Sequence, residues 1–252
     1  MFWPCYIINL KENQQRLRNC EKQFLDLGLD FQIIDAVNGR NLSQEEIDTV
    51  YDSKKNKLHY KASLVASEIG CYLSHYKAWK EIANGPKEGG FVFEDDFKAA
   101  DDLVNVIKAL SEDSMDDWDM VKLFSLDKNP KILSSRIIAK DLKIVQPYKI
   151  PTCLIGYALT KKGARKLISR HSRIFRPVDE DLKYFWETGL RVSLIVPSPV
   201  SIGDQTVSVS TIGNDRKLAG RKLGRLNIKK FLRGIFYRFR YQFLLLYHNK
   251  IR

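Results

Sequence analysis

The chain has 252 residues, of which 44% are hydrophobic and 29% are charged. This length and composition predict one compact α/β body with an appendage, and they argue against a disordered or fibrous chain. The four cysteines, Cys5, Cys20, Cys71 and Cys153, have no CxxC spacing, which predicts reduced, mostly buried thiols in a cytosolic protein and argues against a disulfide framework or a zinc site.

The net charge of +12 is confined to the end of the chain. Residues 216–252 contain twelve Lys or Arg and no Asp or Glu, so the remaining residues are neutral overall. A neutral body argues against a nucleic-acid-binding protein. The first residues have no basic segment before their apolar run, and no stretch reaches roughly 18 uncharged apolar residues, so we expect neither a secretory leader nor a transmembrane helix.

Strands and helices are predicted to alternate along the chain. Short apolar runs predict strands at 4–10, 31–37, 91–96, 118–124, 153–160 and 190–200. Caps and helical periodicity predict helices at 12–27, from Ser43, and at 67–84, 101–110, 160–168 and 177–189. The polar, Lys-rich residues 49–62 are expected to form a mobile loop. Such alternation favours a largely parallel sheet covered on both faces, with ligands beyond the carboxyl ends of its strands.

The predicted strand at 91–96 ends in three acids, Glu94, Asp95 and Asp96. Three like charges repel one another unless a cation or solvent surrounds them. In one interpretation they begin a helix, whose first turn favours acidic side chains. In the other, Glu94 and Asp96 lie on one side of the extended segment and hold Mg or Mn, while Asp95 hydrogen-bonds the backbone. The spacing alone leaves both open.

Six segments resemble glycosyltransferase family 25, the lipooligosaccharide galactosyltransferases of Gram-negative bacteria and their collagen-modifying relatives. In order along the chain they are YIINL with Arg16, IIDAVNGR, SEIGCYLSHYKAW, FVFEDD, IGYALTKKGARKLI and PVDEDL. The resemblance implies a GT-A-like fold, a nucleotide-binding α/β sheet flanked by helices, with the acidic triplet in place of a DxD-type motif. It also implies transfer of a hexose, usually galactose, from a UDP-sugar to a saccharide hydroxyl with inversion.

The resemblance, together with position along the elements, implies roles for individual residues. Glu94 and Asp96 are expected to hold Mn or Mg on the diphosphate of the UDP-sugar, where a metal neutralises charge on the departing UDP. The expected donor-binding residues are Asn9, Arg16, Asp35, His75, Lys122, Thr152, Gly156 and Gln205. Structural alternatives are a surface charge for Arg16, a core residue for His75 and a bulge for Gly156.

An inverting transfer needs a carboxylate that takes the acceptor proton on the face opposite the leaving UDP. Asp179 is the first choice for this catalytic role, and Glu68 and Asp181 are alternatives; Asp179 could equally cap the following helix. Some bacterial relatives place a histidine after the last strand, where residues 201–211 contain none. If that histidine is a metal ligand in the relatives, Asp204 or water would replace it here, or the metal would be held more weakly.

Residues 214–252 are expected to form a basic amphipathic tail attached to a catalytic domain at 1–213. Helical steps separate the apolar residues Ile228, Leu232, Ile235, Phe239, Phe243 and Leu246. This pattern predicts a helix on an anionic membrane surface, or else one packed on the body or a second subunit. A lipid-linked oligosaccharide acceptor would place the protein in the cytoplasm, peripheral on the inner face of the inner membrane. The competing function is a non-catalytic, membrane-associated binding protein of the same fold.

Overall fold

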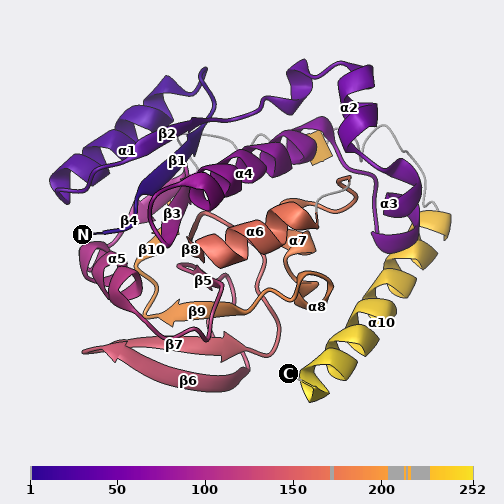
Figure 1. Ribbon diagram of the computed structural model, residues 1–252. Helices are drawn as coiled ribbons and strands as arrows, with labels where there is room; N and C mark the ends of the chain where they lie inside the picture. The colour runs from indigo at the N-terminus through magenta and orange to yellow at the C-terminus, as the bar shows by residue number, and fades with distance from the viewer. Residues whose placement is uncertain (1, 171–172, 204–212, 214, 217–227, 252) are drawn as a thin grey trace.

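The structure is a computed structural model that describes residues 2–170, 173–203, 213, 215–216 and 228–251. Within them, an eight-stranded sheet runs through the centre of the molecule in the order β2-β1-β3-β8-β5-β9-β7-β6 (Figure 1). The strands are β1 (Cys5–Asn9), β2 (Gln32–Asp35), β3 (Gly89–Glu94), β5 (Met120–Lys122), β6 (Ile132–Ala139), β7 (Leu142–Pro147), β8 (Gly156–Thr160) and β9 (Val192–Val196).

Strand pairing follows the prediction in two places. β1 pairs in parallel with β2 and β3, and β5 pairs in parallel with β9. β8 and the β6–β7 hairpin add antiparallel pairs that strand–helix alternation does not predict. The predicted fold class, an α/β sheet flanked by helices, is confirmed. β1 and β3 end at the same edge of the sheet, and β3 brings the acidic triplet there.

Helices cover both faces of the sheet. α4 (Ala66–Asn84) and α6 (Lys161–Ser169) pack on one face, and α1 (Gln14–Asp26) and α5 (Leu103–Glu112) pack on the other. Because side chains alternate along a strand, Tyr6 points toward α4 and Ile7 toward α1. The remaining described elements are η1 (Gly39–Asn41), α2 (Gln44–Val50), α3 (Ser53–His59), β4 (Phe97–Ala99), α7 (Val178–Asp181), α8 (Phe185–Thr188), β10 (Val200–Ile202) and α10 (Ile228–Lys250).

Local signals between β2 and α4 are partly confirmed. Ser43 and Glu46 make both hydrogen bonds of the predicted capping box at the start of α2, at 3.2 and 2.8 Å. The prediction of a mobile loop at 49–62 is wrong, because α3 occupies the middle of this segment. Asp52 caps α3, and the fully buried amide of Asn56 donates to two backbone carbonyls. These buried bonds fix a segment whose composition resembles a loop.

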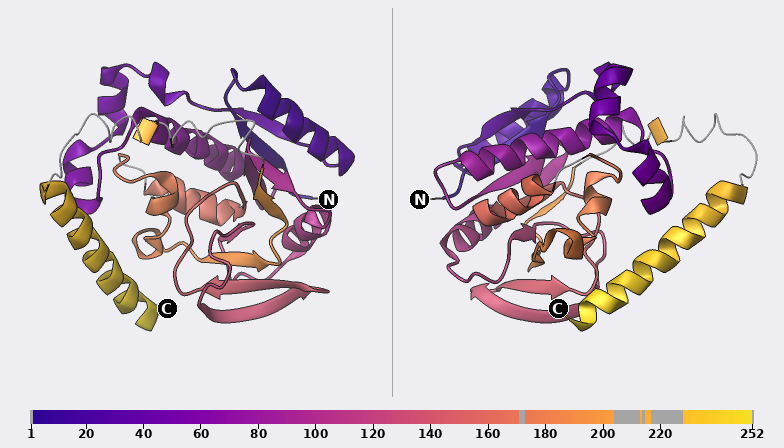
Figure 2. Two further views of the ribbon diagram at one scale, coloured as in Figure 1. Left: turned by 180° about the vertical axis from the view of Figure 1, so that it is seen from behind. Right: turned by 45° about the vertical axis from the view of Figure 1, so that its right-hand side comes forward.

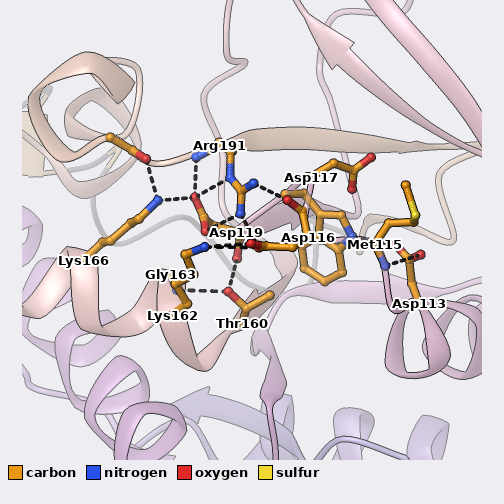
Figure 3. A network of polar contacts seen from close by, with 12 residues as sticks. Asp113, Met115, Asp116, Asp117, Asp119, Thr160, Lys162, Gly163, Lys166 and Arg191 are labelled. Carbon is orange, nitrogen blue, oxygen red and sulfur yellow. Dashed lines mark hydrogen bonds and ion pairs between the residues drawn. The ribbon is translucent and has the colours of Figure 1, made fainter.

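The acids also do not begin a helix, because the short strand β4 follows them and pairs with β10. At the opposite, amino-terminal edge of the central strands, a polar network joins β5, β9 and α6 (Figure 3). The buried Asp119 carboxylate accepts hydrogen bonds from the Arg191 backbone at 2.8 Å, its guanidinium at 3.1 Å and Lys166 Nζ at 2.8 Å. Burial raises the pKa of Asp119, but these donors outweigh burial and hold it below its usual value. The network stabilises the sheet away from the acidic triplet.

The C-terminal helix α10 lies along the side of the body, next to α3, α7 and α8 (Figures 1 and 2). Its buried side chains Tyr237, Tyr241 and Leu245 belong to the same hydrophobic cluster as α4 and α6. The part of the tail at Ile228–Lys250 is therefore helical, as predicted, and one face of this helix packs on the body.

Candidate active site

Asp95, the middle acid after β3, is held by two side chains. Its Oδ2 accepts a hydrogen bond from Asn9 Nδ2 at 2.8 Å, and its Oδ1 accepts one from Arg16 at 2.8 Å. Burial raises the pKa of Asp95, although Arg16 and Asn9 oppose that effect. Alternation along the strand led us to expect a backbone partner for Asp95, and the resemblance and position led us to expect a donor-binding role for Asn9 and Arg16. In the structure these residues bind one another, and Arg16 also lines the cavity beside the acids.

Glu94 ends a chain of buried hydrogen bonds. Trp79 Nε1 donates to Tyr157 Oη at 2.9 Å, Tyr157 Oη lies 3.0 Å from His75 Nδ1, and His75 Nε2 lies 3.0 Å from Glu94 Oε1. Because a carboxylate oxygen accepts hydrogen bonds, the contact with Glu94 calls for a hydrogen on His75 Nε2, and Nδ1 can then accept the hydroxyl hydrogen of Tyr157. Burial raises the pKa of Tyr157 well above its usual value, so the phenol keeps that hydrogen. His75 therefore orients Glu94.

Asp96 has the least support from the protein. Its Oδ1 is buried and has no hydrogen-bond partner among the residues that the structure describes. Burial, and then the neighbouring Glu94 carboxylate, raise the pKa of Asp96 to about 6. A cation relieves both the unpaired oxygen and the repulsion. Glu94 and Asp96 therefore fit a divalent metal that prefers oxygen ligands, such as Mn or Mg.

The acids open into a cavity of about 170 Å³ at the carboxyl ends of β1 and β3. In it, Cys71, His75 and Glu94 place potential ligand atoms within 4.8 Å of one another. Burial, and then the charges of Glu94, Asp179 and Glu68, raise the pKa of the Cys71 thiol well above its usual value. Since a cysteine binds metal as the thiolate, the Glu94–Asp96 oxygens fit a cation better than this cluster does.

The wall of the cavity depends on two glycines whose role the sequence alone does not reveal. Gly39 and Gly70 let the segment after β2 lie directly on α4, because a Cβ on either would collide with the other segment's backbone. Ser74 Oγ fixes the same contact by accepting a hydrogen bond from the backbone N–H of Val37 at 2.8 Å. Both glycines lie in segments that resemble the family, which is the signal that could have identified them.

Asp179 lies in the first turn of α7. Its Oδ2 accepts a long hydrogen bond, 3.3 Å, from the backbone N–H of Cys153, and its Oδ1 accepts the N–H of Glu180 at 2.8 Å. The N-cap of α7 is Pro177, so the capping alternative for Asp179 is not observed. Asp179 also lies close enough to the buried Lys122 ammonium to raise its pKa, as Glu94 does. Asp179 and Glu94 thus both stabilise the charge on the same ammonium.

Lys122 fixes the loop that carries Cys153. Its buried Nζ donates to the carbonyl of Pro151 and, at 3.0 Å, to that of Thr152. Burial lowers the pKa of Lys122 to about 8, against the opposing effect of Cys153 and Asp179. Cys153 itself has φ 73°, a conformation that non-glycine residues seldom adopt and that is commonest at functional sites. Lys122 and Thr152 therefore shape the site through the backbone.

Glu68 is engaged at both oxygens. Its Oε2 accepts the N–H of Val65 at 2.9 Å at the start of α4, and its Oε1 binds the guanidinium of Arg216, with Nε at 2.7 Å. The Glu68 side chain is only 3% exposed. These contacts favour a structural role for Glu68 over the predicted catalytic one, and the kinetics of a Glu68 variant would decide between them.

The other expected residues lie at the edge of the site or away from it. Asp35 is exposed and pairs with Lys11 at 2.9 Å. Asp181 accepts a hydrogen bond from Tyr72 Oη at 2.9 Å within a cluster of arginines. A Cβ on Gly156 would lie 3.3 Å from side chains on the α1–α5 face, so a packing demand accounts for this glycine. Gln205 and Asp204 lie outside the described residues.

Two solved structures align with most of the chain. One, of the inositol-1-phosphate CTP transferase from T. maritima, has a TM-score of 0.43 at 13% identity and covers 89% of this chain and 98% of its own. The other, of an active-site mutant of LgtC, has a TM-score of 0.43 at 11% identity and covers 92% of this chain and 99% of its own.

Sequence comparison finds relatives that are much longer than this chain. Procollagen galactosyltransferase 1-A of Xenopus laevis is 28% identical over 194 residues, which cover 74% of this chain and 31% of that protein. Inactive glycosyltransferase 25 family member 3 of Mus musculus is 27% identical over 267 residues, which cover 92% of this chain and 43% of that protein. The sequence model of glycosyltransferase family 25 (LPS biosynthesis protein) matches residues 2–182, and the chain therefore belongs to this family.

Proposed function

We propose that this member of glycosyltransferase family 25 transfers a hexose, galactose, from its UDP-sugar to a hydroxyl of a lipooligosaccharide or lipopolysaccharide acceptor. The family supports glycosyl transfer as the reaction class. The galactosyltransferase name of a relative supports galactose as the sugar. The proposed transfer inverts the anomeric carbon and is assisted by Mn or Mg.

One observation carries the proposal: β3 delivers Glu94 and Asp96 together into the cavity, where Asp96 Oδ1 is buried without a partner among the described residues. These two carboxylates would hold the metal, which when bound neutralises negative charge on the diphosphate. His75 keeps Glu94 oriented through its hydrogen bond. Asp95, which lies between Glu94 and Asp96, binds Asn9 in β1 and Arg16 in α1 and so anchors the acidic segment to these two elements.

Asp179 is the proposed general base. As the acceptor oxygen bonds to the anomeric carbon, the bond between that carbon and the diphosphate oxygen breaks and its electron pair leaves with UDP. The acceptor proton moves to the Asp179 carboxylate. Cys153 holds Asp179 Oδ2 with one long hydrogen bond, so this oxygen retains acceptor capacity for a hydroxyl.

The test is the transfer kinetics of Asp179→Asn with UDP-galactose and a truncated oligosaccharide acceptor. Loss of a general base predicts a fall in kcat of about 10²–10⁴-fold with donor binding unchanged. A matched control is Asp26→Asn, which alters an exposed carboxylate at the end of α1 that does not line the cavity. A fall of less than about threefold in Asp179→Asn would remove this residue from the catalytic role.

A non-catalytic function is the second candidate, because several relatives carry names that describe them as inactive. Such a protein would bind a nucleotide-sugar or saccharide without turnover. Release of galactose from UDP-galactose in the presence of Mn, slow but dependent on protein concentration, distinguishes an enzyme from a binding protein. Binding of UDP without any release or transfer would favour the second candidate.

A further inference from the structure

The outward side of α10 carries an apolar stripe that the other described residues leave exposed. It consists of Leu232, Phe236, Phe239, Phe243 and Leu246, which we call the outer face. Each of these side chains is more than half exposed. They follow one another at steps of four and three residues, so they share one side of the helix. Exposed apolar patches of this kind mark interaction sites.

The opposite side of α10 is fixed on the body. Tyr237, Tyr241 and Leu245 are buried there, and the guanidinium of Arg233 donates to the carbonyl of Tyr60 at 2.6 Å and to Asn56 Oδ1 at 2.9 Å. Near the C-terminus, the ring of His248 stacks on Trp186 with centroids 4.8 Å apart. The body therefore holds α10 along its side (Figure 2), and the side chains of the outer face remain exposed.

The charge around the outer face is of one sign. The helix α10 itself contains six Lys or Arg and no acid, and its Arg238 and Lys250 are exposed. A second copy of this chain would bring like charges together, whereas an anionic lipid surface attracts them. Phenylalanines and leucines beside basic residues are typical of helices in the membrane interface. Among the described residues, no helix is long and apolar enough to cross a bilayer.

We propose that α10 docks the folded protein on an anionic bilayer, with the outer face inserted among the lipid headgroups and Tyr237, Tyr241 and Leu245 still packed on the body. The membrane-bound unit is thus the whole molecule and not a detached tail. The apolar residues supply insertion, and the basic residues supply selectivity for negatively charged lipid.

Docking in this way also orients the proposed active site. Tyr237 Oη donates to Glu180 Oε2 at 2.9 Å, and Glu180 follows Asp179 in α7. α10 is thus joined to the helix that carries the proposed base, so a lipid-linked saccharide in the same bilayer would approach this side of the molecule. This orientation rests on the proposed function, whereas docking itself does not.

The experiment measures co-sedimentation of the full chain with two kinds of vesicle. One is phosphatidylcholine alone, and the other is phosphatidylcholine with roughly 30 mole per cent phosphatidylglycerol. The Phe239→Gln/Phe243→Gln variant should lose about tenfold or more in partitioning onto the anionic vesicles. The matched control, Leu25→Gln/Ile137→Gln, changes equally exposed apolar residues elsewhere and should bind as the unmodified chain does. Binding should weaken at high salt and be small on neutral vesicles.

Three results would overturn the proposal: equal binding of the outer-face variant, equal binding to neutral vesicles, or no vesicle binding together with a dimer that the outer-face variant dissociates. The last result would assign the outer face to a second copy. A urea midpoint equal to that of the unmodified chain shows that the variant is folded. Transfer to a lipid-free saccharide should survive in the outer-face variant. If the unmodified chain shows no such transfer, the transferase proposal is refuted, but the docking result is unaffected.

Discussion

Replacing Glu68 by Gln or Ala separates a structural role from a catalytic one. Glu68→Ala removes the cap of α4, a loss of about 1 kcal/mol, and the ion pair with Arg216. The Arg216 side chain is 49% exposed, so solvent screening limits the ion pair to about 1 kcal/mol instead of the larger cost of breaking a fully buried pair. Glu68→Gln keeps an oxygen for the Val65 N–H and should lose only the second contribution. We therefore expect losses in the free energy of unfolding of about 2 kcal/mol for Ala and about 1 kcal/mol for Gln.

Urea unfolding measures these losses, and steady-state transfer measures the catalytic effect on the same preparations. A structural residue predicts that Glu68→Gln keeps kcat within about threefold of the unmodified enzyme, whereas removal of a general base lowers kcat by about 10²–10⁴-fold. Arg216→Gln is the matched variant from the other side of the pair and should reproduce the stability loss of Glu68→Gln. Unchanged stability with a large loss of kcat in Glu68→Gln would refute the structural assignment and return Glu68 to the position of base.

Three further predictions concern buried groups. Tyr157→Phe leaves the buried Trp79 Nε1 without its acceptor, so it should lower the free energy of unfolding by about 1–3 kcal/mol and weaken Mn-dependent UDP binding; unchanged metal dependence would contradict the orienting chain. Asp119→Ala leaves Arg191 and Lys166 without their buried partner. It should lower the free energy of unfolding, measured with urea, by about 3–5 kcal/mol, and the folded fraction should still bind UDP. A loss below about 1 kcal/mol would show that the network does not stabilise the fold. The pKa of Lys122 in the folded state is about 8, below its ordinary 10.5, so the unfolded chain binds more protons between these values and stability rises with pH across them. Between about pH 7 and about pH 11, the free energy of unfolding of the unmodified chain should therefore rise by about 3 kcal/mol relative to that of Lys122→Met. A difference between the two proteins that does not change with pH would show that burial does not lower this pKa.

Local signals in the sequence predict much of the fold. The capping box at Ser43 and the apolar periodicity of 67–84 depend on near neighbours, and both appear in the structure as predicted. The β6–β7 hairpin was not predicted. Its turn at Lys140–Asp141 lacks the Asn-Gly or Asp-Gly signal, and the polar residues of β6 interrupt its apolar pattern. Asp141 nevertheless adopts φ 61° to close the turn.

The site was predictable to the extent that it follows strand geometry. Side-chain alternation after β3 separates Asp95 from Glu94 and Asp96, and the structure gives Asp95 different partners. The partners themselves lie far away in the sequence. Asn9 is 86 positions from Asp95, and Arg216 is 148 positions from Glu68. Spacing cannot reveal such pairs, because they exist only after β1, β3 and α4 have packed.

Calorimetric titration of UDP with and without Mn tests the central claim, that Glu94 and Asp96 form a cation site for the diphosphate. The account predicts tight, Mn-dependent UDP binding in the unmodified chain and in the control Asp26→Asn, and loss of this Mn-dependent binding in Asp96→Asn. The urea midpoint of Asp96→Asn should be unchanged or higher, because a buried carboxylate oxygen without a protein partner among the described residues is replaced. Mn-dependent UDP binding of equal strength in folded Asp96→Asn would contradict the account.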